Sequence, residues 1–157
     1  FIFVLALAVL LLKRQGYFLV YQVTPSVPKG FYLIVPTKNI KRGDLVVFRP
    51  PIVTTNFLEE KKWLPQSGLM MKYVFGVPGD TACTKGDALW LNGEKITPIE
   101  NFYAPGKSLP RANFCGRITA THYLLLSTLK ARSFHGRYFG LVDRQAILGR
   151  AVPIWIK

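Results

Sequence analysis

The chain has 157 residues, of which 50% are hydrophobic and 18% are charged, and its net charge is +13. This length suits a single domain, and the apolar fraction excludes an intrinsically disordered chain. The 2 Cys and 2 His do not stand in a C-x-x-C or H-E-x-x-H spacing, which argues against a zinc site. Neither a phosphate-binding loop nor a G-x-G-x-x-G fingerprint is present, so no cofactor is expected.

The positive charge is concentrated toward the carboxyl end. Residues 101–157 contain nine Lys or Arg but a single acidic residue, Asp143. A basic surface attracts nucleic acid or an anionic bilayer, although it can also serve solubility alone. The first residues of the chain favour the membrane.

Residues 1–12 (F-I-F-V-L-A-L-A-V-L-L-L) are uninterrupted apolar, and Lys13 and Arg14 follow. A helix of this length reaches about 18 Å, short of the ~30 Å hydrocarbon core of a bilayer. Because the chain begins with Phe1, we expect further upstream residues to complete one span. A cleavable signal peptide is the alternative, but no basic start precedes the run, and apolar-aromatic sequence resumes at Gly16–Tyr21. We predict a membrane anchor over residues 1–14 and a catalytic domain over residues 15–157.

The rest of the chain is typical of β structure. Short runs of β-branched and aromatic residues alternate with Gly, Pro, Asn and Asp turn signals. The predicted strands are Phe31–Val35, Leu45–Phe48, Met70–Val77, Ala88–Leu91, His122–Ser127 and Ala146–Trp155. The sequence therefore predicts a mainly β fold behind one amino-terminal transmembrane helix.

Two local signals add detail to this fold. Asn92-Gly93 lies between two short apolar runs and predicts a two-residue hairpin turn. One short helix is predicted over Phe57–Leu64, with Asn56 as its cap and Glu59 three residues on. No internal repeat or long linker divides the domain.

Cys83 and Cys115 are the two cysteines. If the domain lies outside the cytoplasm, they could form a disulfide that closes a loop of about 33 residues and stabilises by roughly 3–4 kcal/mol. Two separate buried thiols are the alternative.

Three stretches carry residue types suited to catalysis. In the first, Thr24–Tyr32, Ser26 lies between two prolines, on a stiffened turn that can expose its hydroxyl. In the second, Met70–Asp80, Lys72 interrupts a run from Leu69 to Val77 that is otherwise apolar or Gly. A strand in which Met71 and Tyr73 flank this lysine would desolvate its ammonium group and lower its pKa from about 10.4.

The third stretch reads S-F-H-G-R-Y-F-G from Ser133 to Gly140, and G-R-A-V follows at 149–152. Its composition indicates a turn-rich loop that leads into a strand.

Together these stretches resemble signal peptidase I, and specifically the TraF-type peptidases of conjugative transfer systems. S-V-P-K-G-F-Y resembles the nucleophile box of that family, and R-G-D-L-V-V-F (residues 42–48) resembles the strand segment that follows it. M-K-Y-V-F-G-V-P-G-D resembles the lysine box, and S-F-H-G-R-Y-F-G the carboxy-terminal box. All four occur in the family's order.

The resemblance implies that Ser26 attacks the scissile carbonyl and that Lys72 removes its proton. It also implies that Ser133 orients the lysine amine and that Thr24 joins the Ser26 N–H group in an oxyanion hole. Arg137 matches the arginine of the last box.

His135 departs from the family pattern, which has Asp at this position as a support behind the site. A histidine can supply a hydrogen bond but not a fixed negative charge. Alternatively, His135 is a loop residue with no role in the site. A Ser-His-Asp triad of Ser26, His122 or His135, and Asp143 is a further alternative, although His122 opens an apolar strand and reads as structural.

The function that the resemblance implies is a membrane-anchored serine endopeptidase that cleaves after small residues in exported precursors. Conjugation-type members mature pilins and can take part in their cyclisation, so a pilin precursor is the predicted substrate. Expected partners are this precursor, or a signal-peptide-bearing protein, and membrane lipid; nucleic acid is not expected. The expected location is the bacterial inner membrane, with the catalytic domain on the periplasmic side. The alternative function is a non-catalytic basic β-domain that binds DNA or a secretion-complex partner at the membrane.

Overall fold

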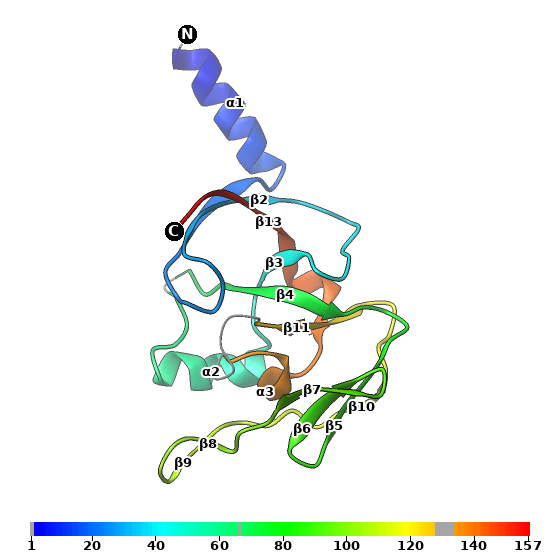
Figure 1. The fold of residues 1–157 in the computed structure, drawn as a ribbon. Coiled ribbons are helices and arrows are strands. Elements are labelled where there is room, and N and C mark those ends of the chain that lie inside the picture. Colours follow the sequence, from blue (N-terminus) through cyan, green and yellow to red (C-terminus); the bar gives the residue numbers. More distant parts are fainter. Residues whose placement is uncertain (1, 66, 128–133) are drawn as a thin grey trace.

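The computed structural model describes residues 2–65, 67–127 and 134–157. Most of the strands form one seven-stranded sheet (Figure 1). In spatial order this main sheet consists of β1 (Phe18–Gln22), β2 (Gly30–Val35), β13 (Ile147–Ile156), β3 (Leu45–Phe48), β4 (Met70–Gly76), β11 (His122–Leu126) and β12 (Val142–Asp143). All pairings between these neighbours are antiparallel. The expectation of a mainly β fold is confirmed.

A smaller sheet lies at the end of the molecule opposite the first helix (Figure 1). It consists of β10 (Cys115–Arg117), β5 (Thr81–Lys85), β6 (Ala88–Leu91) and β7 (Glu94–Pro98). A separate two-stranded hairpin pairs β8 (Phe102–Ala104) with β9 (Lys107–Ser108). Asn92 and Gly93 connect β6 to β7 with φ values of 52° and 85°. Positive φ at both positions is the geometry of a type I′ turn, so the predicted hairpin is confirmed.

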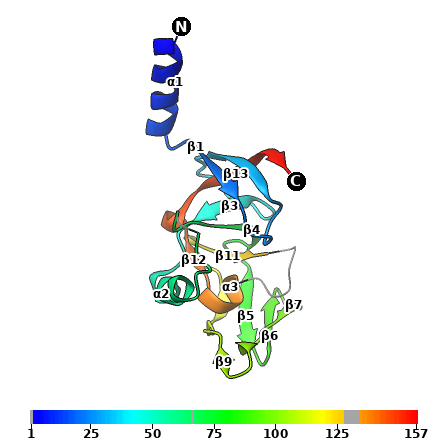
Figure 2. The same cartoon turned by 90° about the vertical axis from the view of Figure 1, so that its left-hand side faces the viewer.

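Four helical segments complete the described chain: α1 (Ile2–Arg14), α2 (Ile52–Glu60), α3 (Gly136–Phe139) and the 3₁₀ turn η1 (Arg144–Ala146). Figures 1 and 2 both show α2 and α3 side by side, between the main sheet and the β8–β9 hairpin. Within the described ranges, no helix combines the length and the apolar character that crossing a bilayer requires.

The predicted bounds of the second helix are wrong. The helix begins at Ile52 instead of Phe57 and ends at Glu60. Pro51 fixes the backbone just before the first turn, and its carbonyl oxygen accepts hydrogen bonds from the hydroxyl groups of Thr54 (2.9 Å) and Thr55 (3.2 Å). The β-branched threonines of this first turn therefore support a helix start at Ile52.

Apolar residues form three clusters. The first packs the main sheet against α2 and α3 and includes Val46, Val74 and Tyr138. The second includes Val27, Ile34 and Met71 and fixes the loop between β1 and β2. The third joins the small sheet to β11 through Leu89, Ile118 and Leu124, among others. The small sheet thus shares a core with the main sheet.

Two of the motifs noted in the sequence meet in the structure. Arg42 donates to both carboxylate oxygens of Asp80, at 2.8 and 2.7 Å. Asp80 also accepts bonds from the Val77 N–H group (2.8 Å) and the Asn92 amide (2.9 Å). Burial opposes ionisation of this carboxyl group, but the hydrogen bonds and the charge of Arg42 outweigh it, so its pKa is lowered. The Gly-Asp end of the lysine stretch therefore has a structural role, tying β4 to the small sheet.

Cys83 and Cys115 are cross-strand neighbours on β5 and β10, and a disulfide joins them with an S–S distance of 2.07 Å. The bond encloses the β6, β7, β8 and β9 strands, over a sequence separation of 32. It closes the part of the chain that lies between the Lys72 stretch and the 133–140 stretch.

We predict that Asp80→Asn lowers the free energy of unfolding at pH 7 by about 1–3 kcal/mol, because it removes a charged acceptor with three partners. The pKa of Asp80 is lower in the folded protein, so its contribution is present above about pH 4 and is lost as the pH falls through the folded value. Denaturant unfolding at pH 7 and pH 3 measures both effects, and the difference between the two proteins should be smaller at the lower pH. Asp87, whose side chain is 84% exposed, provides the matched control Asp87→Asn. Equal losses in the two variants would contradict the role of Asp80.

Candidate active site

Ser26 lies on the loop that connects β1 to β2, and three contacts fix this loop. The side chain of Val27 is fully buried in the second core cluster. The Tyr32 hydroxyl donates to the carbonyl of Pro28 at 2.7 Å, and the Ser127 hydroxyl donates to the carbonyl of Ser26. Pro25 and Pro28 restrict the backbone on either side. The loop therefore holds Ser26 half-buried in one orientation.

The hydroxyl of Ser26 belongs to a short polar chain. Its Oγ lies 3.3 Å from Oγ1 of Thr24. The buried side chain of Gln22 donates to that Thr24 oxygen at 2.6 Å and to the Thr24 carbonyl at 2.9 Å. Because Thr24 accepts a hydrogen bond from Gln22, its own O–H group is available to donate toward Ser26 or toward a bound substrate.

Lys72 lies in the middle of β4, opposite Val46 of β3. Its side chain is only 3% exposed. Alternate residues of a strand share a face, so the neighbours of Lys72 on its face are Met70 and Val74, which belong to the first core cluster. Met71 and Tyr73 belong to the second cluster, on the opposite face. The expected desolvation of Lys72 is confirmed. Of the two flanking residues, Met71 lines the same cleft as Lys72, and Met70 and Val74 share the strand face of Lys72.

Burial lowers the pKa of Lys72 to about 8. A lysine with this pKa is about 20% neutral at pH 7.4, against about 0.1% for an unperturbed lysine. The corresponding cost of about 3 kcal/mol is borne by the folded protein. Lys72 can therefore accept a proton near neutral pH.

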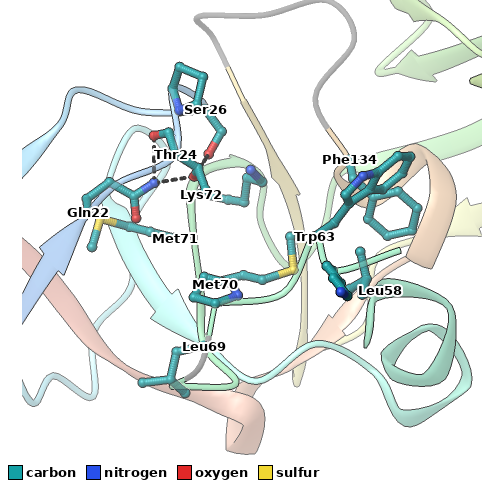
Figure 3. Close-up of a pocket in the computed structure, with 13 residues that line it drawn as sticks. Gln22, Thr24, Ser26, Leu58, Trp63, Leu69, Met70, Met71, Lys72 and Phe134 are labelled. Carbon is teal, nitrogen blue, oxygen red and sulfur yellow. Dashed lines mark hydrogen bonds between the residues drawn. The ribbon is translucent and has the colours of Figure 1, made fainter. Parts of the chain in front are cut away.

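Ser26 and Lys72 line the same cleft, which has a volume of about 370 Å³. Figure 3 shows Ser26, Thr24 and Lys72 gathered at one end of the cleft and Leu58, Trp63 and Phe134 at the other. The remaining residues that line it are Gln22, Pro25, Lys62, Pro65, Leu69, Met70 and Met71. The cleft thus joins a polar, reactive end to an apolar wall.

His135 and Arg137 lie behind the cleft, at the start of α3. Both side chains are almost completely buried. Arg137 donates to the Thr97 hydroxyl at 2.9 Å and to the Pro98 carbonyl, which ties α3 to β7. Gly136 lets the helix approach β11, because a Cβ atom there would lie 2.9 Å from the Leu125 carbonyl oxygen.

His135 is held neutral. Burial lowers its pKa to about 2, and the positive charges of Arg137 and Lys72 add to the effect. Its Nδ1 atom is buried without a hydrogen-bond partner among the described residues.

The remaining site candidates lie elsewhere. Ser133 falls outside the described residues. His122 and Asp143 face each other on β11 and β12, with Nε2 and Oδ2 3.9 Å apart, and neither lines the cleft. The described residues therefore do not assemble a Ser-His-Asp triad around Ser26.

Sequence reasoning missed several residues of this site. Gln22 and Ser127 position the serine loop, and Leu58 and Trp63 form the apolar wall. Leu58 lies on α2 and Trp63 just beyond its end; both fell within the predicted helix, but the sequence did not indicate that they face the cleft. A polar residue at the end of an apolar strand was the available signal for Gln22.

Comparison with known proteins agrees with this geometry. The family model described as signal peptidase, peptidase S26, matches residues 1–156. The plasmid transfer protein TraF of Escherichia coli is 31% identical over 153 residues, covering 89% of this chain and 85% of that protein. Signal peptidase I of Leptolyngbya laminosa is 31% identical over 113 residues, covering 71% of this chain and 51% of that protein.

Among solved structures, a signal peptidase I from Enterococcus faecalis V583 matches with a TM-score of 0.42 and 20% identity, covering 74% of this chain and 98% of that chain. The family match extends over almost all of the sequence, including every stretch that forms the cleft. The chain therefore belongs to the S26 family of signal peptidases, which are serine endopeptidases.

Proposed function

We propose that this chain is a membrane-anchored signal peptidase that uses Ser26 as nucleophile and Lys72 as general base. The observation that carries the proposal is a buried lysine, with a pKa of about 8, in the same cleft as a fixed serine hydroxyl. A lysine in an apolar strand is costly, and perturbed titratable groups in clefts are characteristic of catalytic sites.

In the proposed reaction, the neutral amine of Lys72 takes the proton of Ser26 as Oγ attacks the scissile carbonyl carbon. The resulting ammonium gives this proton to the leaving amine, and the peptide C–N bond breaks to leave an acyl-enzyme. Water then repeats the sequence with Lys72 as base and releases the acid. The cleft needs no further titrating group, because the same nitrogen serves both half-reactions.

Thr24 suits the oxyanion position in this scheme. Gln22 occupies an acceptor site on its oxygen, so the Thr24 proton can point to the developing negative charge, a contribution worth about 3 kcal/mol in the transition state. We assign Ser133 to orienting the Lys72 amine. Arg137 and His135 would support the site by fixing α3 behind it.

The proposed substrate is an exported precursor, cleaved after a small residue. The relative named plasmid transfer protein TraF favours a conjugative pilin precursor among such substrates. An extended, apolar cleft wall is suited to an uncharged stretch of polypeptide.

The proposed location is the bacterial inner membrane, with the catalytic domain on the periplasmic side. Next to α1, the main sheet exposes an outer apolar face that we define by Leu19, Tyr21, Phe31 and Trp155, which are 64%, 53%, 47% and 53% exposed. Tyr21 pairs with Phe31, and Phe31 with Trp155, across three neighbouring strands. A solvated sheet face normally carries polar residues, so this face, together with α1, is suited to contact with lipid.

We predict that Ser26→Ala and Lys72→Ala each reduce kcat/KM by at least about a thousandfold, because the two residues act as a unit. Lys72→Arg should fail equally, since a guanidinium group stays protonated. Peptidase assays on a precursor with an Ala-x-Ala site measure the loss, and thermal unfolding checks the fold. Ser108→Ala and Lys95→Ala, both on exposed strands, are the controls. Cleavage by Lys72→Ala at the wild-type rate would exclude the dyad.

The pH dependence of kcat/KM should reveal the base. Because only the neutral amine is active, kcat/KM should rise with pH through an apparent pKa of about 8. His135→Asp places a carboxylate near Lys72, with Arg137 beside it to keep it ionised. This charge favours the ammonium form and should move the midpoint to higher pH. His135→Asn, which adds no charge, is the control. A midpoint that is the same in the wild type and in His135→Asp would contradict electrostatic coupling between the two positions.

The outer apolar face should matter only for membrane-held substrates. We expect the double variant Phe31→Ser/Trp155→Ser to cleave soluble peptides normally but to process a membrane-embedded precursor several-fold more slowly. Deletion of residues 1–14 should have the same selective effect. Phe102→Ser, which alters a 58% exposed aromatic residue on the distant hairpin, is the matched control. Unchanged processing of the embedded precursor by both altered proteins would argue against membrane placement.

A further inference from the structure

Helix α2 ends in a motif that brings a lysine to the cleft. The Lys62 N–H group donates to the Glu59 carbonyl at 2.9 Å, and the Trp63 N–H group donates to the Leu58 carbonyl at 2.8 Å. This pair of bonds is the Schellman arrangement, with Lys61 as the last half-helical residue. Lys62 occupies its left-handed position with a φ of 55°.

A lysine is an unfavourable residue at this position. Glycine is the usual occupant, because a Cβ atom strains the left-handed backbone. Lys62 is one of two non-glycine residues with positive φ in the described chain, and the other, Asn92, is of a type that tolerates this conformation. Strain that persists at the edge of a candidate active site suggests that the side chain is needed there.

The motif also fixes where Lys62 lies. Leu58 and Trp63, its apolar contact pair, form the cleft wall together with Lys62. Trp63 packs against Phe57, with ring centroids 5.7 Å apart, and against Phe134 at 6.4 Å. Figure 3 shows Leu58 and Trp63 at the end of the cleft away from Ser26, and Lys62 directly precedes Trp63 in the chain.

The charges around the cleft leave Lys62 available to a substrate. Lys62 and Lys72 are the ionisable residues among those that line it, and no carboxylate joins them. Lys72 must be neutral to act as a base. Within the described ranges, no acidic group lies within ion-pair distance of Lys62. The neighbouring Lys61, by contrast, pairs with Glu60 and lies over the rings of Phe57 and Tyr103.

From this placement we infer that Lys62 is a specificity-determining residue, which favours substrates carrying a carboxylate beside the stretch that contacts the Leu58–Trp63 wall. The carboxylate is an Asp or Glu side chain or the free carboxyl terminus of the substrate. Lys62 is exposed at the edge of the cleft, so its ammonium group can reach a carboxylate on a bound substrate, and an attraction between solvated charges gives a modest preference that salt weakens. The inference rests on the proposed peptidase function and adds a substrate class to it.

The test uses the full chain and Ala-x-Ala peptides in which one Gln at a time, at six positions around the scissile bond, is replaced by Glu. A second set compares free and amidated carboxyl termini, which separates the two sources of carboxylate. We expect about a fivefold higher kcat/KM for the acidic peptide at one of these positions, and a smaller ratio at high salt. Lys62→Met should abolish this ratio and Lys62→Glu should invert it, whereas Lys61→Met should retain it.

Lys62→Gly separates recognition from folding. This variant should raise the Tm, because glycine removes the backbone strain, and should still lose the preference for acidic peptides. Peptide binding to Ser26→Ala, followed by the fluorescence of the tryptophans, supplies a readout that does not need catalysis. If Ser26→Ala binds acidic peptides more tightly in a Lys62-dependent way while the wild-type chain cleaves no peptide, the inference is upheld and the proposed catalysis is overturned. The inference would be overturned if acidic and neutral peptides had equal kcat/KM and equal Kd. It would also be overturned if Lys62→Met still preferred acidic peptides.

Discussion

The burial of one amine determines what this fold can do. Lys72 lies on β4 of the main sheet, between β3 and β11, and the loss of hydration there lowers its pKa to about 8. The fold bears a cost of about 3 kcal/mol for this position, a large part of the net stability of a small domain. Such a cost is understandable if the amine has to exchange protons near neutral pH. The serine loop lies at the same end of the cleft as this amine, and the apolar wall lies at the other end.

Contacts outside the cleft hold the strands and the loop that carry Lys72 and Ser26. Arg42 and Asp80 join β4 to the small sheet, and the Cys83–Cys115 disulfide closes the segment that contains β6 to β9. Ser127 connects the end of β11 to the backbone of Ser26. These contacts fix the loop that carries Ser26 relative to the strands that flank Lys72. A non-catalytic basic domain would need neither the buried amine nor the fixed serine.

The sequence predicted the strands well where apolar periodicity was strong, as in Leu45–Phe48 and Ala88–Leu91, whose bounds match the structure. It missed short strands such as Thr81–Lys85, in which pairing rather than side-chain pattern determines the conformation. Ser26 and Lys72 could be proposed from the resemblance to signal peptidases. The cleft wall could not, because the Schellman motif that places Trp63 depends on backbone hydrogen bonds at the end of a helix that composition misplaced.

The central claim concerns the protonation of one nitrogen and can be measured directly. In the Ser26→Ala variant, the chemical shift of the Lys72 Cε nucleus can be followed by NMR as the pH rises, with Lys72→Arg identifying the signal. The account predicts a titration midpoint of about 8, well separated from the other lysines. A midpoint near the ordinary value of 10.5 would show that the amine is not desolvated, and Lys72 could not then serve as the base.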